Sequence, residues 1–118
     1  MRISLFLLTL LSGAIGLSNI ALAAEAVPIV LMLQNKQFDP QHLILATGVK
    51  LKIVIRNLDA IPAEFESYDL SREVVIPAHG EVSIYIGPLD PGTYQFFNDF
   101  NHDMQGSIEA RPVVTREN

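Results

Sequence analysis

The sequence predicts an all-β fold, a β-sandwich of about seven to eight strands, and three observations support that prediction. Short segments with alternating apolar side chains recur at the spacing typical of sandwiches, and Pro, Gly, Asn and Asp separate them. No segment after residue 23 has the apolar period of a long helix, and we expect the one short candidate, residues 68–72, to be a loop. Removing residues 1–23 from the 118 leaves 95, which is enough for one small domain.

Seven segments fit the strand pattern. In residues 49–57 three aliphatic side chains alternate with three basic ones, so one face is apolar and the other is charged. Residues 81–87 alternate in the same way. The predicted strands, with the turns that begin or end some of them, are 28–35, 42–48, 49–57, 72–80, 81–87, 88–97 and 106–110. We expect the inward positions to form the core, namely Leu45, Ile53, Ile55, Phe65, Ile84, Ile86, Tyr94 and Phe96.

The first 23 residues read as a cleavable secretory signal peptide. Arg2 precedes an apolar run from Ile3 to Leu17, and Ala21-Leu22-Ala23 provides the small-x-small cleavage pattern. The run is shorter than the ~20 residues that a spanning helix needs. We therefore expect cleavage after Ala23, a periplasmic location, and a single domain over residues 24–118. The alternative is a short membrane anchor.

Charge and cysteine content exclude several classes of function. The chain has 8 basic and 13 acidic residues, and only Arg2 lies in the predicted signal, so the mature charge is 7 − 13 = −6. An acidic domain without basic clusters is a poor candidate for nucleic acid or an anionic membrane surface, and it suits cations. The absence of Cys excludes thiolate chemistry and a disulfide-linked partner.

Several sequence pieces resemble a known family. They are "FDP" at 38–40, "TGVKLKIVIRN" at 47–57, "AEFES" at 63–67, "VVIPAHGEVSIYIGPLDPGTYQFF" at 74–97, and a methionine two residues before Gly106. The chain resembles cupredoxins over about residues 36–110, in particular the small periplasmic cupredoxin-like proteins of the EfeO type. The resemblance implies a Greek-key sandwich with a metal at one end, and an association with periplasmic iron uptake.

The resemblance also implies where copper ligands would stand, and most of them are missing. Asn98 occupies the cysteine position and Asn101 the position of the second histidine, whereas Met104 stands where the family has methionine. The first histidine position falls at Ala63 or Glu64. A blue copper site needs a thiolate and two imidazoles, so we expect this chain to have none.

The two loops still carry other metal-binding side chains, which we expect to meet at one end of the sandwich. The predicted metal ligands are Glu64, Glu66, Asp99, His102 and Met104. Carboxylates and one imidazole suit iron, manganese, zinc or Cu(II) better than Cu(I), and only the methionine favours copper. The expected ion is iron or copper.

Each of these residues also has a purely structural interpretation. Glu64 and Glu66 bracket Phe65, so if Phe65 faces the core both carboxylates lie on the opposite, exposed face. His102 can belong to a polar loop, and Met104 can plug the end of the core, since methionine fills irregular gaps. His42 and His79 lie outside the predicted metal loops, and we expect both at the surface.

Three functions remain open from the sequence. The first is a periplasmic metal-binding protein in ferrous iron uptake, which binds Fe(II) or oxidises it for a membrane permease. The second is a non-blue copper-binding or electron-transfer protein, and the third is a metal-free adaptor of a membrane complex. No hydrolase or transferase motif is present, so ferrous iron oxidation is the one enzymatic activity under consideration.

Overall fold

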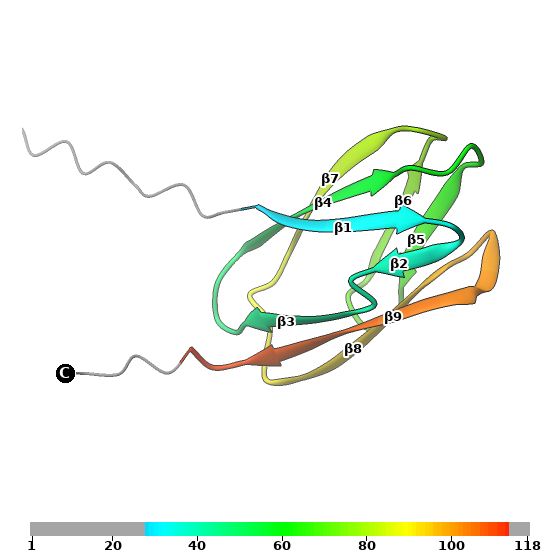
Figure 1. Cartoon of the computed structure of the whole chain (residues 1–118). Coiled ribbons are helices and arrows are strands. Elements are labelled where there is room, and N and C mark those ends of the chain that lie inside the picture. The colour runs from blue at the N-terminus through cyan, green and yellow to red at the C-terminus, as the bar shows by residue number, and fades with distance from the viewer. Residues whose placement is uncertain (1–27, 114–118) are drawn as a thin grey trace, which may run out of the picture.

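The computed structural model describes residues 28–113, and these residues form nine β-strands in two layers (Figure 1). The strands are β1 (Ile29–Gln34), β2 (Gln37–Asp39), β3 (His42–Ala46), β4 (Leu51–Asn57), β5 (Ala63–Ser67), β6 (Arg72–Ile76), β7 (Glu81–Ile86), β8 (Gly92–Asn98) and β9 (Asn101–Arg111). The described residues contain no helix that is long and apolar enough to cross a membrane.

The two layers are sheets of four and five strands. The four-stranded sheet has the order β2-β1-β4-β7, and the five-stranded sheet has the order β3-β9-β8-β5-β6. The pairs β1–β4 and β3–β9 are parallel, whereas the other pairs are antiparallel. The sandwich predicted from the sequence is therefore confirmed.

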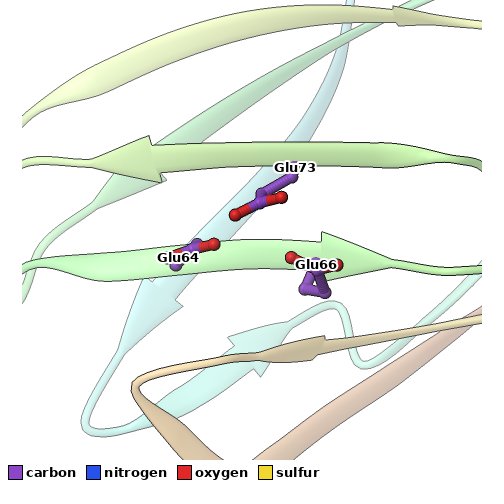
Figure 2. A group of neighbouring side chains, drawn as sticks. All are labelled: Glu64, Glu66 and Glu73. Atoms are coloured by element: carbon purple, nitrogen blue, oxygen red, sulfur yellow. The ribbon is translucent and has the colours of Figure 1, made fainter.

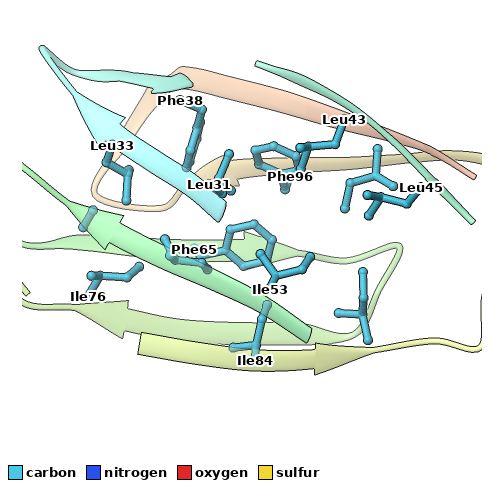
Figure 3. Close-up of a cluster of buried hydrophobic side chains, with 14 of the residues drawn as sticks. Leu31, Leu33, Phe38, Leu43, Leu45, Ile53, Phe65, Ile76, Ile84 and Phe96 are labelled. Carbon is cyan, nitrogen blue, oxygen red and sulfur yellow. The ribbon is translucent and has the colours of Figure 1, made fainter. Parts of the chain in front are cut away.

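The core lies between the facing sides of the two sheets (Figure 3). All of the predicted core residues are buried except Tyr94, which is half-buried and packs against the cluster. At the centre, the ring of Phe96 meets the ring of Phe38 edge-on at 4.9 Å and lies 5.2 Å from that of Phe65. Gly106 lies beside Phe96 in the strand register, and a Cβ there would collide with the Phe96 ring.

The structure differs from the predicted strands in three places. β2 and β5 were not among the seven predicted segments, because β2 is only three residues long and β5 has one large apolar side chain among its five residues. β9 starts at Asn101 rather than at 106. Residues 68–71 form a turn, as expected, and the predicted signal peptide lies outside the described residues.

Candidate metal centre

Strand β5 places two glutamates on the outer face of the five-stranded sheet. Ala63, Phe65 and Ser67 are buried toward the core, and side chains alternate along a strand, so Glu64 and Glu66 lie on the opposite face. This is the arrangement of the structural interpretation of these residues, except that Glu64 is buried rather than exposed. Their burial differs, because Glu64 is only 8% exposed whereas Glu66 is half-buried.

A third carboxylate joins them from the neighbouring strand. Glu73 of β6 stands directly opposite Glu66 in the antiparallel pair, and Glu64 stands opposite Val75. One carboxylate oxygen from each of Glu64, Glu66 and Glu73 lies within 4.8 Å of the others (Figure 2). The outer face therefore carries a three-carboxylate cluster, hereafter the glutamate cluster.

The carboxylates of this cluster destabilise one another's charged forms. The pKa of Glu64 is raised from 4.5 to about 7 by a hydrogen bond with Glu73, by burial, and by the charges of Glu73, Asp99 and Glu66. The pKa of Glu66 is raised by burial and by the charges of Glu73 and Asp99, while its hydrogen bond with Glu64 lowers it. Near neutral pH the cluster therefore favours either a retained proton or a neutralising cation.

No basic side chain among residues 28–113 forms an ion pair with the glutamate cluster. Arg72 precedes Glu73 in sequence, but its Nε donates to the carbonyl oxygen of Tyr85 at 2.9 Å and its Nη1 to that of Ser71 at 3.1 Å. Neither of these guanidinium bonds is directed at the cluster. In the described part of the chain, the side-chain hydrogen bonds of Glu64 are those to the other carboxyls of the cluster.

Asp99 and His102 lie next to the cluster, in the β8–β9 hairpin. The backbone amide of Asp99 donates to the carbonyl oxygen of Glu64 at 2.9 Å, which brings this turn alongside β5. Nε2 of His102 lies 2.9 Å from Oδ1 of Asp99, and the imidazole meets the ring of Phe97 edge-on at 5.2 Å. Of the predicted ligands, the structure brings the carboxylates of Glu64 and Glu66 together, whereas the carboxylate of Asp99 lies outside the group within 4.8 Å and contacts His102.

Met104 lies apart from these residues, inside the core. It is 4% exposed and belongs to the buried hydrophobic cluster, as the structural interpretation of this residue required. Its sulfur accepts a hydrogen bond at 3.3 Å from Nδ2 of Asn98, which is itself buried. The predicted set therefore divides between two faces of one sheet, with Met104 on the inner face.

The positions that the resemblance assigns to copper ligands do not fit a blue copper ion. Ala63 offers no donor atom. The side-chain oxygen of Asn98 accepts the backbone amides of Glu64 at 2.9 Å and of Phe100 at 3.1 Å, and its amide group donates to Met104. The side chain of Asn98 therefore serves as a structural bridge, and without a thiolate or imidazole at these positions only the thioether of Met104 matches the copper chemistry.

Sequence reasoning did not identify Glu73. This residue lies in a predicted strand, 72–80, but the pairing order of the strands cannot be read from the sequence, and Glu73 faces Glu66 only through the β5–β6 register. The sequence signal that could have identified Glu73 is a pair of outward glutamates in one strand, followed after a tight turn by an outward glutamate in the next strand. His42 and His79 are exposed, as expected.

Comparison with known proteins relates the chain to one family. Residues 3–110 match the family model described as a cupredoxin-like domain. An uncharacterized protein of Rickettsia prowazekii (strain Madrid E) is 36% identical over 77 residues, which are 64% of this chain and 62% of that protein. The matched region thus spans less than two thirds of that relative's length.

Solved structures share the fold at low sequence identity. Amicyanin from Paracoccus versutus superposes with a TM-score of 0.59 at 12% identity, over 75% of this chain and 86% of amicyanin. The metal-binding domain of the Cu(I)-exporting P-type ATPase CopA of Streptococcus pneumoniae D39, determined with Cu(I), gives 0.64 at 19% identity, over 71% and 84% of the two chains. These likenesses show the fold, and they confirm the predicted cupredoxin-like sandwich.

Proposed function

Because the chain belongs to the cupredoxin-like domain family, we propose that it is a metal-binding protein that holds a hard cation, Fe(II), on the outer face of its five-stranded sheet. The observation that carries this proposal is the glutamate cluster. Three carboxylates lie within 4.8 Å of one another, and one of them is 8% exposed and has no ion-pair partner in the described chain, so a bound cation would neutralise an otherwise unfavourable cluster of charges.

The ligand chemistry favours a hard ion. The glutamate cluster offers only oxygen ligands, which suit Fe, Mn, Mg or Ca ions and discriminate against Cu(I), because Cu(I) prefers thiolate and thioether sulfur. Anionic oxygen ligands also stabilise Fe(III) relative to Fe(II), so a bound ferrous ion is easier to oxidise. Ferrous iron oxidation, in which an external one-electron acceptor takes the electron that Fe(II) releases, is accordingly part of the proposal.

The proposed setting is periplasmic iron uptake, with a membrane iron permease as the partner that receives the ion. The signal-like segment of residues 1–23 and the resemblance to the EfeO type support this setting. The acidic mature charge supports a cation as cargo rather than an anionic partner.

Copper is the second candidate, because another amicyanin structure with the same fold is described as a reduced Cu(I) form, and the CopA domain was determined with Cu(I). Among the described residues at the positions that the resemblance assigns to copper ligands, Met104 is the only copper-type ligand. A copper ion would therefore be Cu(II) held by oxygen on the outer face, without the intense colour of a copper thiolate.

Titration calorimetry with Fe(II) under anoxia, Mn(II), Cu(II) and Cu(I) tests the proposal. We expect Fe(II) and Mn(II) to bind, and Glu66→Gln and Glu73→Gln each to weaken binding by removing one anionic ligand. Glu81→Gln is the matched control, because Glu81 lies on the other sheet and pairs with Arg56 at 2.9 Å. Tight Cu(II) binding with no Fe(II) binding would favour copper, whereas no binding of any ion would favour the adaptor function.

A further inference from the structure

We infer that the protein has a second ligand site, a cavity between β2 and β9 that binds a small zwitterion of the α-amino acid class. The inference goes beyond the proposed function, because the cavity lies on other strands than the glutamate cluster and binding there needs no metal. It rests on an unpaired edge of β9, on the walls and floor of the cavity, and on two opposite charges that form no ion pair in the described part of the chain.

The cavity lies at an edge of the sandwich where β9 has a neighbour on one side only. β9 pairs with β8 from Asn101 to Ala110, whereas β3 pairs on the other side only with Ser107–Arg111. β2 is the terminal strand of the opposite sheet and lies beside β9 (Figure 1). At the other edge of the sandwich, Nε of Arg72 in β6 donates to the carbonyl oxygen of Tyr85 in β7 at 2.9 Å and so bridges the two sheets. At the edge formed by β2 and β9, a cavity remains between them.

The cavity has an apolar floor and polar walls. Its volume is about 270 Å³, just below the roughly 300–1,000 Å³ of drug-sized ligand pockets, so it suits a small molecule. Phe38 and Met104 are each 4% exposed and belong to the hydrophobic core, so they form the floor. The other lining residues are polar or charged, namely Lys36, Gln37, Gln41, Asp103 and Gln105.

The edge of β9 also offers a hydrogen-bond donor to the cavity. The amide of Ser107 donates to the carbonyl oxygen of Gln41 at 3.0 Å, and the side-chain amide of Gln41 donates to the carbonyl oxygen of Gln105 at 3.2 Å. Backbone groups two residues apart point to the same side of a strand, so the amide of Gln105 also points away from β8. Among residues 28–113 no strand pairs with β9 at this point, and the Gln105 amide is left without a strand partner.

Two of the lining residues carry opposite charges. Lys36 belongs to the β1–β2 turn, which is fixed because the backbone amides of Asn35 and Lys36 donate to the carboxylate of Asp59 at 2.8 and 2.9 Å. Asp103 belongs to β9 on the opposite wall. Neither Lys36 nor Asp103 forms an ion pair with the other, or with any side chain of residues 28–113.

This pair of charges selects the class of ligand. A simple cation in the cavity would be repelled by Lys36, and a simple anion would be repelled by Asp103. A zwitterion satisfies both residues, because its carboxylate accepts from Lys36 and its ammonium group donates to Asp103 in charge-assisted hydrogen bonds. The volume of the cavity and its apolar floor then suit the side chain of an α-amino acid.

Titration calorimetry of the purified protein in EDTA, with L-glutamine and L-leucine as probes, tests this site. The two probes share the zwitterionic group, and their side chains suit the amide walls and the apolar floor respectively. We expect at least one of them to bind. Acetylation of its amino group, or amidation of its carboxylate, should each weaken binding about tenfold or more, since each removes a charge-assisted hydrogen bond. The inference is overturned if neither amino acid binds, or if the blocked forms bind as tightly as the free one.

Substitutions in the walls test the two charges separately. Lys36→Gln and Asp103→Asn should each weaken binding of the same amino acid about tenfold or more. Lys52→Gln and Asp90→Asn are the matched controls, because both residues are exposed and neither lines the cavity. Their effects should stay within about twofold, since exposed charges are screened by salt. Equal effects of the wall variants and the controls would refute the assignment of the site.

Nuclear magnetic resonance locates the bound amino acid. The backbone amide signals of Gln37 and Gln105 should shift on its addition, whereas shifts confined to β5 and β6 would place the ligand elsewhere and overturn the inference. Glu66→Gln should bind the amino acid as tightly as the parent does. A parent that binds the amino acid but neither Fe(II) nor Mn(II) refutes the proposed function alone, and the reverse result refutes this inference alone.

Discussion

Replacing Asn98 by Ala should lower the free energy of unfolding far more than an ordinary surface substitution does. We expect this even though Asn98 occupies a position where cupredoxins, the family that the chain resembles, have a metal ligand. The buried amide of Glu64 loses its acceptor at 2.9 Å, and the part-buried amide of Phe100 loses its acceptor at 3.1 Å. The sulfur of Met104 also loses its donor. Asn98 thus joins β5, the hairpin turn and the core through one side chain.

The size of the effect follows from these contacts. A buried donor left without a partner costs about 1–3 kcal/mol, and the part-buried amide, which water reaches, adds up to about 1 kcal/mol. We therefore expect Asn98→Ala to lower the free energy of unfolding by about 1–4 kcal/mol. For a domain of this size each kcal/mol corresponds to about 4–8 °C, so Tm should fall by roughly 4–32 °C.

Thermal and urea denaturation of the cation-free protein would measure this change. Asn101→Ala is the matched control, because Asn101 lies on the same hairpin and its side-chain oxygen makes only an exposed 3.3 Å bond to the amide of Asp103. Its effect should stay within about 0.5 kcal/mol, as is usual for surface sites. If Asn98→Ala destabilises the protein no more than Asn101→Ala, the proposed structural role of Asn98 is wrong.

Four further outcomes are expected. Ile53→Ala should cost about 2–5 kcal/mol in urea denaturation, because the side chain is fully buried, and a loss below about 0.5 kcal/mol would contradict its core position. Gly106→Ala should cost about 1–3 kcal/mol, since the new Cβ meets the Phe96 ring, and Phe96→Leu in the same chain should recover part of the loss. In EDTA, the free energy of unfolding should fall as pH rises from about 4.5 to about 7, because folded Glu64 retains a proton that the unfolded chain releases. Thermal melts of Glu64→Gln should show a weaker dependence of stability on pH. An unchanged dependence would count against the raised pKa of Glu64. Intact-mass measurement of the exported protein should show a chain that begins at Ala24, and a mass that includes Met1 would support the anchor instead.

The fold could be predicted largely from the sequence, because the strand signal is local. Alternation of apolar and polar side chains in residues 49–57 and 81–87 identifies strands and their inward faces, and the inward isoleucines are buried as expected. β5 was harder to identify, because it is only five residues long and Phe65 is its one large apolar side chain.

The candidate site could be predicted only in part. Glu64 and Glu66 lie two residues apart on one strand, so their common face follows from the period of a strand. Glu73 needed the β5–β6 register, and a shift of one residue in that register would have placed it on the other face.

In the β8–β9 hairpin, too, the direction of the side chains depends on the register between the strands. His102 and Met104 are two residues apart and would share a face in a regular strand, yet His102 contacts outward Phe97 whereas Met104 is buried in the core. The ladder jumps from Phe97–Gln105 to Asn98–Asn101, and this irregularity breaks the alternation. Sequence spacing alone could not show this.

The sequence by itself therefore determined the sandwich, the inward positions of its main strands and, through the absence of cysteine, the loss of a blue copper site. Only the tertiary structure decided that Glu73 completes the glutamate cluster, that Asp99 lies beside it, and that Met104 belongs to the core. The physical reason is that alternation and composition act within a few residues of the chain, whereas a cation site requires side chains from separate strands. Their positions are set by strand register and by hairpin irregularities, which depend on packing across the whole domain.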